Sequence, residues 1–425
     1  MAIGDIVQND FESFVDKTTG AHVQRLTPKG LTCHLTGRGN QVRCTSPDGL
    51  ALLYAGEYGG ARELYVMNLR TGKAVQLTRG GQVNPYGATF VSNDAVLYVE
   101  DDVLWSMSIQ VLLRTKVYAC EEGWTIHEYT TSDDGRYLLL TLVKRGAVPF
   151  DVAQPDWSFF SLSSIAAPLT RIVLLDRQTS EKRVVLEENQ WITGARLRPH
   201  DPSVILYCHD GPFDIIDARI WLVDSDGSNV RCCRSQPDGE IVGGEHWSAD
   251  GSRIMFQVWK RGRGAKSAEL CSIDADTLEE QAVMRTHPYA HAGNDSHDRW
   301  LVGDSAGLGI PLHLLDPTEP LKVPEGKELE DCVYLCDLEH GRELRLCHHG
   351  TSWLSAFGTT QDTHPHASIS SDGSSVLFVS DRDGTPGIYR VDLARFLRER
   401  DSGAGPVELS DHDLPDVSWG FPATF

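Results

Sequence analysis

The chain lacks long apolar runs and has little positive charge. Nowhere in its 425 residues do 18 apolar residues follow one another, and the N-terminus, MAIGDIVQNDFESF, has no basic segment followed by an apolar one. The sequence therefore predicts neither a membrane span nor a signal peptide. Lys and Arg number 39 against 60 Asp and Glu, a formal charge of −21. Nucleic acids and anionic membranes require clustered Lys and Arg, so we expect neither as a partner.

The ten cysteines include no Cys-x-x-Cys pair, which argues against both a zinc ribbon and a disulfide scaffold. Reduced and mostly buried thiols are typical of a cytoplasmic protein, and we predict that location. The negative charge also bears on the ligand. If the ligand is anionic, a local positive centre must outweigh the field of the whole chain, and a bound divalent ion provides one.

A repeated unit runs through the chain. Each copy has a turn of the Ser-x-Asp-Gly type, an apolar run, a loop, a second run ending in Asp or Asn, a tight turn and a third run. The clearest copies include Ser248-Ala249-Asp250-Gly251 and Ser371-Asp372-Gly373. The seven copies are marked by turn aspartates at Asp48, Asp94, Asp134, Asp201, Asp250, Asp298 and Asp372. Two spacings are long, and we attribute them to insertions near 146–168 and 304–330.

With the strand that precedes each turn, every unit has four strands joined by hairpins. Seven four-stranded antiparallel blades predict an all-β fold, a seven-bladed β-propeller. The segment AHVQRLT, residues 21–27, is similar to the fourth strand of other units and has no complete unit before it. We therefore expect the N-terminal strand to complete the last blade and close the ring. No linker composition stands out before residue 400, so we predict a single domain over residues 1–425.

Histidines occur on strands expected to lie innermost, where propeller sites are built. His364 and His366 come eight and six residues before the turn aspartate of the last unit, and strand alternation would point both to one side. His291 comes seven residues before the preceding turn aspartate, and Gln361 lies just upstream of His364. Imidazoles with an amide oxygen suit Mn, Fe, Ni or Zn better than Ca. For each histidine alone, a solvated or hydrogen-bonded loop residue is the competing interpretation.

A second polar group lies between the strands VILYC and RIWLVD. His209 and Arg219 flank a Gly-Pro turn there, in what we interpret as a structured loop at the end of a sheet. Arg219 is able to hold a carboxylate with two parallel hydrogen bonds. The competing interpretation is a salt bridge from Arg219 to Asp214 or Asp217.

Six segments spread along the chain carry a family resemblance. They are, in order, TGAHVQRLTP, TCH, LLYAGEY, CHDGPFDIIDARIWLVDSDGSNVR, HHGTSW and QDTHPH. In these segments the chain resembles the oligogalacturonate lyases, a family of propeller-type pectate-degrading polysaccharide lyases. The resemblance covers most of the chain. It implies a divalent metal, Mn²⁺, held by His291, Gln361, His364 and His366, and a substrate-stabilising arginine at Arg219.

One position departs from the family pattern. The family's catalytic base is a histidine in a Thr-His-Glu-Phe-Trp context, and the matching stretch here is GGEHW, with Gly244 in place of that histidine. His246 has the same strand parity as Gly244 and is the first candidate base, although it stands where the family has a phenylalanine and packing is the competing interpretation. His209 and His34, in family-like segments, are further candidates for base and substrate binding.

The resemblance implies pectin degradation by β-elimination in a short, acidic oligogalacturonate. A bound metal and Arg219 would neutralise the uronate carboxylate, a neutral imidazole would remove the C5 proton, and the C4 oxygen would leave. Two alternatives stay open: the same metal site acting on another uronate-containing oligosaccharide or glycoside, because Gly244 leaves space, and a non-catalytic PD40-type propeller that binds a partner. A propeller-fused serine peptidase is excluded by length. The sequence does not set the oligomeric state.

Overall fold

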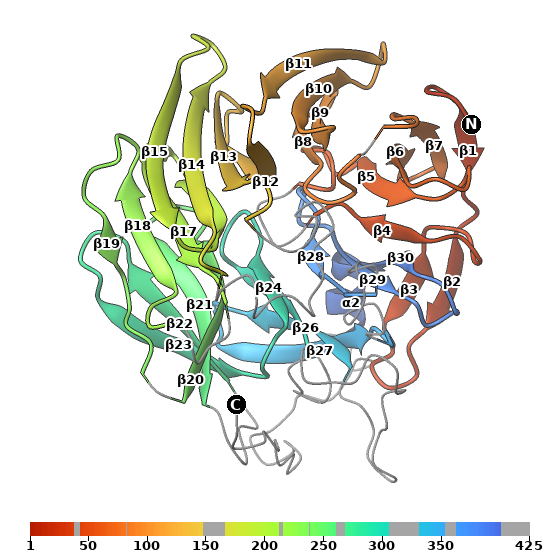
Figure 1. Ribbon diagram of the computed structural model, residues 1–425. Helices are drawn as coiled ribbons and strands as arrows, with labels where there is room; N and C mark the ends of the chain where they lie inside the picture. The colour runs from red at the N-terminus through yellow and green to blue at the C-terminus, as the bar shows by residue number, and fades with distance from the viewer. Residues whose placement is uncertain are drawn as a thin grey trace.

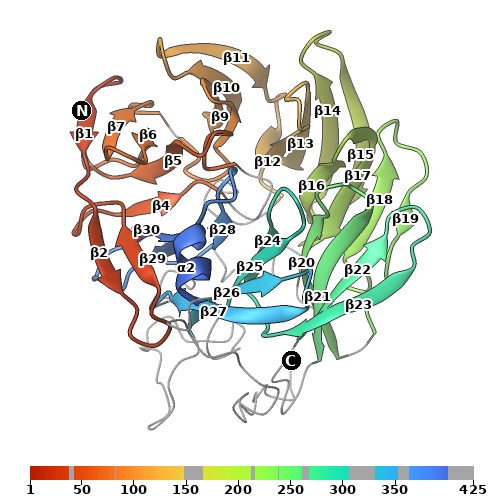
Figure 2. The ribbon, with the colours of Figure 1, turned by 180° about the vertical axis from the view of Figure 1, so that it is seen from behind.

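Seven antiparallel sheets surround a common centre in the computed structural model of the chain (Figures 1 and 2). The predicted seven-bladed β-propeller is confirmed. The structure describes residues 1–37, 43–81, 83–147, 166–211, 216–237, 239–260, 268–305, 331–352 and 363–400. The two expected insertions fall mostly outside these residues, and so do residues 401–425. In the described part of the chain, no helix is long and apolar enough to cross a membrane.

The first four blades are built as follows, each from its innermost strand outwards. Blade 1 has β4 (Cys33–Leu35), β5 (Ala51–Gly56), β6 (Glu63–Asn68), β7 (Lys73–Gln76) and β1 (Ile6–Gln8). Blade 2 has β8 (Thr89–Ser92), β9 (Ala95–Glu100), β10 (Val103–Ser108) and β11 (Leu113–Ala119). Blade 3 has β12 (Trp124–Thr131), β13 (Tyr137–Lys144), β14 (Leu169–Asp176) and β15 (Lys182–Asn189). Blade 4 has β16 (Ile192–Arg198), β17 (Asp201–His209), β18 (Ile220–Asp224) and β19 (Arg231–Cys232).

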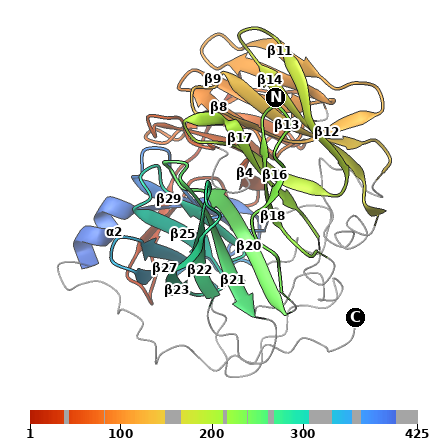
Figure 3. The ribbon, with the colours of Figure 1, turned by 90° about the vertical axis from the view of Figure 1, so that its left-hand side faces the viewer.

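The last three blades follow the same plan. Blade 5 has β20 (Glu240–Trp247), β21 (Arg253–Lys260), β22 (Ala268–Asp274) and β23 (Glu280–Thr286). Blade 6 has β24 (His291–Asn294), β25 (Trp300–Asp304), β26 (Cys332–Asp337) and β27 (Arg342–His348). Blade 7 has β28 (Ser368–Ile369), β29 (Ser375–Ser380), β30 (Gly387–Asp392), β3 (His22–Arg25) and β2 (Glu12–Val15). Helix α2 (Leu393–Glu399) follows β30 and lies at the outside of the ring in the side view of Figure 3.

The N-terminal strands close the ring, as predicted. Strand β3 pairs with β30, with Val23 opposite Val391, and so supplies the fourth strand of blade 7. In Figure 1 these red and blue segments lie side by side. Strand β2 continues the same sheet, and β1 pairs with β7 of blade 1. These two additions make blades 1 and 7 five-stranded, where four strands were expected.

The repeated turn has the same hydrogen bonds in four blades. In blade 5, the Ser248 hydroxyl donates to Asp250 at 2.7 Å and accepts from the Arg253 amide at 2.9 Å. Gly251 follows with φ +71°, a conformation that favours glycine. The equivalent serines are Ser46, Ser132 and Ser370. In the last unit the bonded serine is therefore Ser370, and the expected Ser371 was wrong by one residue.

Seven clusters of buried side chains among the described residues fill the spaces between neighbouring blades. Alternation along each strand divides its side chains between two clusters. On β5, Leu52 and Tyr54 pack toward blade 7, whereas Leu53 and Ala55 pack toward blade 2. Because each blade shares its core with both neighbours, the ring is stabilised as one unit.

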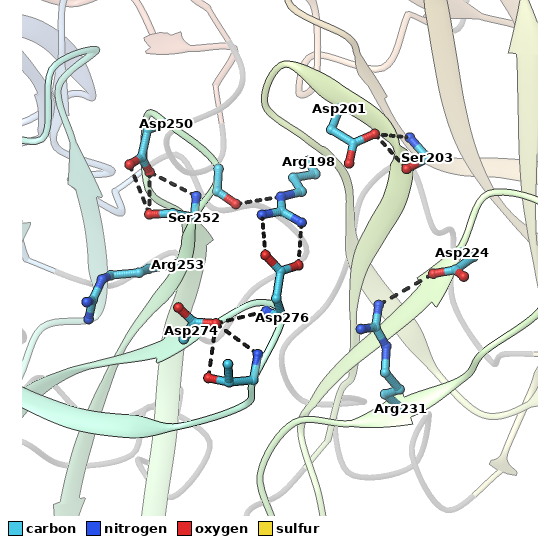
Figure 4. Close-up of polar contacts among 12 residues, drawn as sticks. Arg198, Asp201, Ser203, Asp224, Arg231, Asp250, Ser252, Arg253, Asp274 and Asp276 are labelled. Carbon is cyan, nitrogen blue, oxygen red and sulfur yellow. Dashed lines mark hydrogen bonds and ion pairs between the residues drawn. The ribbon is translucent and has the colours of Figure 1, made fainter.

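Polar contacts also join adjacent blades at their turns. Arg198, at the end of β16, forms a paired contact with Asp276 of blade 5, at 2.8 and 3.3 Å (Figure 4). Its Nε donates to the Gly251 carbonyl at 2.7 Å. These bonds fix the turns of blades 4 and 5 relative to each other.

Asp16 ties the closing strands to blade 6. It lies in the β2–β3 turn, is 5% exposed, and accepts from the His348 backbone amide at 3.0 Å and from its Nδ1 at 3.3 Å. The hydrogen bond to Asp16 raises the pKa of His348 to about 10. Burial alone would raise the pKa of Asp16, but hydrogen bonds from His348 and Thr19 lower it well below its usual range. The pair is therefore charged across the neutral range.

We expect Asp16→Asn to lower the free energy of unfolding by about 1–3 kcal/mol, because it weakens a buried charged hydrogen bond. The Asp16 contribution is present above its unfolded pKa of 3.8 and is lost as pH falls. The His348 contribution is complete below 6.5 and is lost as pH rises toward about 10. The difference between wild type and variant should therefore be largest between pH 3.8 and 6.5. Urea denaturation across this range measures it.

Asp226→Asn is the matched control. Asp226 accepts from the amide and hydroxyl of Ser228, but in an exposed hairpin turn. We expect this variant to change stability by less than about 0.5 kcal/mol. Equal losses in both variants would mean that Asp16 has no special part in closing the ring.

Candidate metal centre and its surroundings

Three histidines from two adjacent blades lie together at the centre of the ring. One ligand nitrogen from each of His291, His364 and His366 lies within 4.8 Å of the others. The ring centroids of His291 and His366 are 3.8 Å apart, and His364 lies 5.6 Å from His291 and 5.5 Å from His366. The predicted convergence of these side chains is present.

The reason for the convergence differs from the expected one. His364 and His366 precede β28 and lie outside any strand, and His366 has φ +44°, so strand alternation does not place them. Backbone hydrogen bonds of the residues between and beside them hold the segment instead. The Thr363 carbonyl accepts from Thr351 and the Pro365 carbonyl accepts from the Val379 amide. A left-handed non-glycine residue is strained, and such strain is concentrated at functional sites.

His291 is held by Asp304, the residue opposite it on the neighbouring strand. It opens β24, directly opposite Asp304 of β25. Its Nδ1 lies 2.8 Å from Oδ1 of Asp304, which is fully buried, while the Ala367 amide donates to Oδ2 at 2.8 Å. One carboxylate thus contacts both the His291 ring and the residue that follows His366.

The donor set fits a transition-metal ion. Three imidazole nitrogens at mutual distances of 4.8 Å or less can reach one ion, and imidazole suits Mn, Fe, Ni or Zn. The contact of Asp304 with Nδ1 of His291 has the usual carboxylate–histidine–metal order, in which an ion is bound at Nε2. Gln361, the fourth predicted ligand, lies outside the described residues.

Asp337, Glu339 and His340 form a second group with ligand spacing at the β26–β27 turn. Glu339 and His340 are exposed, and Asp337 already bonds to His340 at 2.9 Å and to Arg342 at 3.3 Å. The group is explained by these contacts within the turn.

Arg219 lies in a buried cluster of charges between blades 4 and 5. Its Nη1 donates to Asp210 at 2.6 Å, and its Nε and Nη2 contact Glu245 at 3.0 Å. The competing interpretation was a salt bridge from Arg219 to Asp214 or Asp217. Asp217 was the wrong partner, and Asp214 lies outside the described residues. Burial alone would raise the pKa of Glu245, but Arg219 lowers it to about 2. A guanidinium has five N–H donors, so Arg219 has others to offer a further carboxylate.

Gly244 of β20 faces Ala292 of blade 6. It is exposed, has φ +70°, and a Cβ added there would meet only the Ala292 Cβ, at 3.6 Å. Ala292 follows His291, and Glu245 follows Gly244. Adjacent residues of β20 therefore approach Ala292, on the blade 5 side of β24, and Arg219 of blade 4.

His246 does not share the side of Gly244. A β-bulge lies between Gly243 and His246 in the pairing of β20 with β21, so the expected strand parity is wrong. His246 is 1% exposed and its Nδ1 lies 2.7 Å from the Gly244 carbonyl. Burial lowers its pKa to about 4. His246 is therefore buried under the bulge, against the Gly244 carbonyl.

The other two candidate bases lie in different blades. His209 ends β17 next to Arg219, whose carbonyl accepts from the His209 amide at 3.0 Å. Its side chain is 12% exposed, and its Nε2 lies 2.9 Å from Glu188. His34 is 2% exposed in blade 1, where it stacks on Tyr86 at 4.7 Å. His209 is thus the most accessible of the three candidates.

Two residues of this region were not singled out from the sequence. Asp304 was assigned to the start of an insertion, although a hairpin closed by the turn near Asp298 would have placed it opposite His291. Glu245 was quoted only as part of GGEHW, and nothing in the linear sequence pairs it with Arg219. The register of β24 and β25 reveals the first, and the contact between blades 4 and 5 reveals the second.

Comparisons with known proteins agree with this geometry. A family model described as oligogalacturonate lyase matches residues 1–396. An oligogalacturonate lyase of Dickeya dadantii and an oligogalacturonide lyase of Pectobacterium atrosepticum are each 30% identical over 395 residues, 92% of this chain and 97% of the relative.

Two solved structures are similar over the same extent. An oligogalacturonate lyase in complex with manganese has a TM-score of 0.81 at 30% identity, covering 92% of this chain and 98% of that chain. An oligogalacturonate lyase from Vibrio parahaemolyticus has a TM-score of 0.80 at 30% identity, covering 92% and 99%.

The geometry predicts that His364→Ala weakens Mn²⁺ binding by at least about 100-fold, because it removes one of three imidazole ligands. Titration of the metal-free protein, followed by the electron paramagnetic resonance of free Mn²⁺, measures the affinity. His340→Ala is the control and should leave the tight site unchanged. Loss of binding in His340→Ala alone would move the centre to the β26–β27 turn.

Proposed function

The chain belongs to the oligogalacturonate lyase family, and we propose that it is a metal-dependent lyase that cleaves short oligogalacturonates by β-elimination. The observation that carries the proposal is the convergence of His291, His364 and His366, each of which offers one ligand nitrogen within 4.8 Å of the others. An acidic substrate needs a positive centre in a chain with a formal charge of −21. A bound metal ion would supply one, because Arg219 is already paired with Asp210 and Glu245.

We assign the metal to His291, His364 and His366, with Gln361 as the fourth ligand implied by the family, and Mn²⁺ as the ion. When bound, the ion supplies Lewis-acid chemistry that stabilises charge on a uronate carboxylate. The protein's own part is to hold three neutral imidazoles in place and to exclude competing carboxylate ligands. The partly buried position of His291 and the buried His364 and His366 suit that role.

Arg219 binds and orients the uronate carboxylate in this proposal. Asp210 and Glu245 fix its guanidinium from two sides, so little side-chain freedom is lost when a substrate binds. Its remaining N–H donors would contact the substrate carboxylate and stabilise negative charge as the C5 proton leaves.

We propose His209 as the base that replaces the family's histidine. Glu188 can only accept, so the proton of the neutral ring is placed at Nε2 and the lone pair at Nδ1. His209 also adjoins Arg219, which holds the carboxylate next to the acidic C5 proton. Proton transfer from C5 to Nδ1, with departure of the C4 oxygen, gives an unsaturated uronate.

A second candidate substrate is favoured by Gly244. The open space beside Ala292 would accept a substituent that a histidine at this position would exclude. The same metal centre would then act on another uronate-containing oligosaccharide or glycoside. For either substrate we propose that the enzyme acts in the cytoplasm on short fragments, releasing 4-deoxy-5-keto-uronate from pectic ones.

The proposed function is tested with the purified protein, Mn²⁺ and a panel of uronate oligosaccharides, following the ultraviolet absorbance of the unsaturated product. We expect product from oligogalacturonate, loss of activity with a chelator, and recovery with Mn²⁺. Product from another uronate alone would support the second candidate. Metal binding with no elimination on any member of the panel would favour a non-catalytic propeller.

The proposed base predicts a contrast between two substitutions. We expect His209→Gln to lower kcat by about 10²- to 10⁴-fold, the usual contribution of a general base. His246→Phe, which preserves packing under the bulge, should change kcat only a few-fold. Both variants should keep wild-type Mn²⁺ affinity and circular dichroism. The reverse pattern, with His246→Phe inactive and His209→Gln active, would make His246 the base.

A further inference from the structure

Asp304 connects the two blades that carry the histidine cluster. It ends β25 in blade 6, is fully buried, and receives two hydrogen bonds of 2.8 Å, one at each oxygen. One partner is Nδ1 of His291 in its own blade. The other is the backbone amide of Ala367 in blade 7, directly after His366.

Full burial makes this carboxylate costly unless positive charge lies near it. Among the described residues, no Lys or Arg forms an ion pair with Asp304, and its salt-bridge partner is the His291 ring. A cation bound to Nε2 of His291 would complete a carboxylate–histidine–metal arrangement, with Asp304 at Nδ1. Such an ion would offset part of the cost of burying Asp304, in addition to the two hydrogen bonds that it receives.

We propose that Asp304 is the positioning residue of the metal centre: it fixes the His291 tautomer that presents Nε2 to the ion, and it anchors the segment that carries His364 and His366. The inference rests on the proposed metal centre. A carboxylate has acceptors only, so it can receive the Nδ1–H of His291 and the Ala367 N–H at once. No neutral isostere can do both.

Asp304→Asn tests whether two acceptor oxygens are needed, because asparagine has nearly the same shape as aspartate but only one acceptor oxygen. If the amide oxygen accepts from Ala367, the amide NH₂ faces His291 and requires a bare Nδ1. The ring proton then moves to Nε2, where it blocks metal binding. If the amide oxygen accepts from His291 instead, the Ala367 amide loses its acceptor and the His366 segment is released.

Asp337→Asn is the matched control. Asp337 lies at the other end of blade 6, is 2% exposed, and bonds to Nδ1 of His340 at 2.9 Å, yet that histidine is outside the three-histidine cluster. Both substitutions thus remove a buried carboxylate that contacts an imidazole in the same blade.

The test is Mn²⁺ titration of the full-length, metal-free proteins, monitored by electron paramagnetic resonance. We expect Asp304→Asn to weaken binding by about 10- to 100-fold, the usual effect of removing an outer-shell partner. Asp337→Asn should bind like wild type. The ¹⁵N chemical shifts of the histidine side chains give a second readout: the protonated nitrogen of His291 should be Nδ1 in wild type.

The outcomes separate this inference from the proposed function. Wild-type Mn²⁺ affinity in Asp304→Asn, or a His291 ring protonated at Nε2 in wild type, would overturn the role of Asp304 and leave the lyase intact. A wild-type protein that binds no Mn²⁺ would overturn the metal centre and the inference with it. Equal loss in both Asn variants would assign the effect to general stability and also overturn the inference.

Discussion

The ring is closed by hydrogen bonds between β3 and β30, and the position of the histidine cluster depends on that closure. Blade 7 carries His364 and His366, and its sheet is complete only when the first residues of the chain join the last strand. Asp16 then binds the same closing segment to blade 6, which carries His291. Blade 7 is thus completed, and joined to blade 6, by contacts between residues more than 300 positions apart in the chain.

Departures from regular strand geometry shape the mouth of the ring. Strands β16 and β20 are both bulged, and each bulge holds a glycine in the left-handed region, Gly194 and Gly244. His366 has a left-handed backbone as well, at φ +44°. A side chain beside such a bend leaves the plane of its sheet and can reach the centre. Irregular backbone thus occurs next to Glu245, which contacts Arg219, and within the candidate metal centre.

Much of the fold could be predicted from the sequence, because the repeated Ser-x-Asp-Gly turn forms its bonds within a few residues. The three converging histidines were found by their distance from those turns, and ring closure by the orphan strand at residues 21–27. The bulge that buries His246 could not be foreseen, since alternation assumes unbroken pairing. Asp304 and Glu245 could not be found for a related reason: Asp304 contacts His291 in a neighbouring strand and Glu245 contacts Arg219 in a neighbouring blade.

Anomalous X-ray scattering from a crystal grown with Mn²⁺ tests whether the three histidines hold the metal. We expect one strong peak at bonding distance from His291, His364 and His366, with Asp304 still bonded to the far nitrogen of His291. A peak confined to the Asp337, Glu339 and His340 turn, or no peak between the three histidines at saturating Mn²⁺, would contradict it.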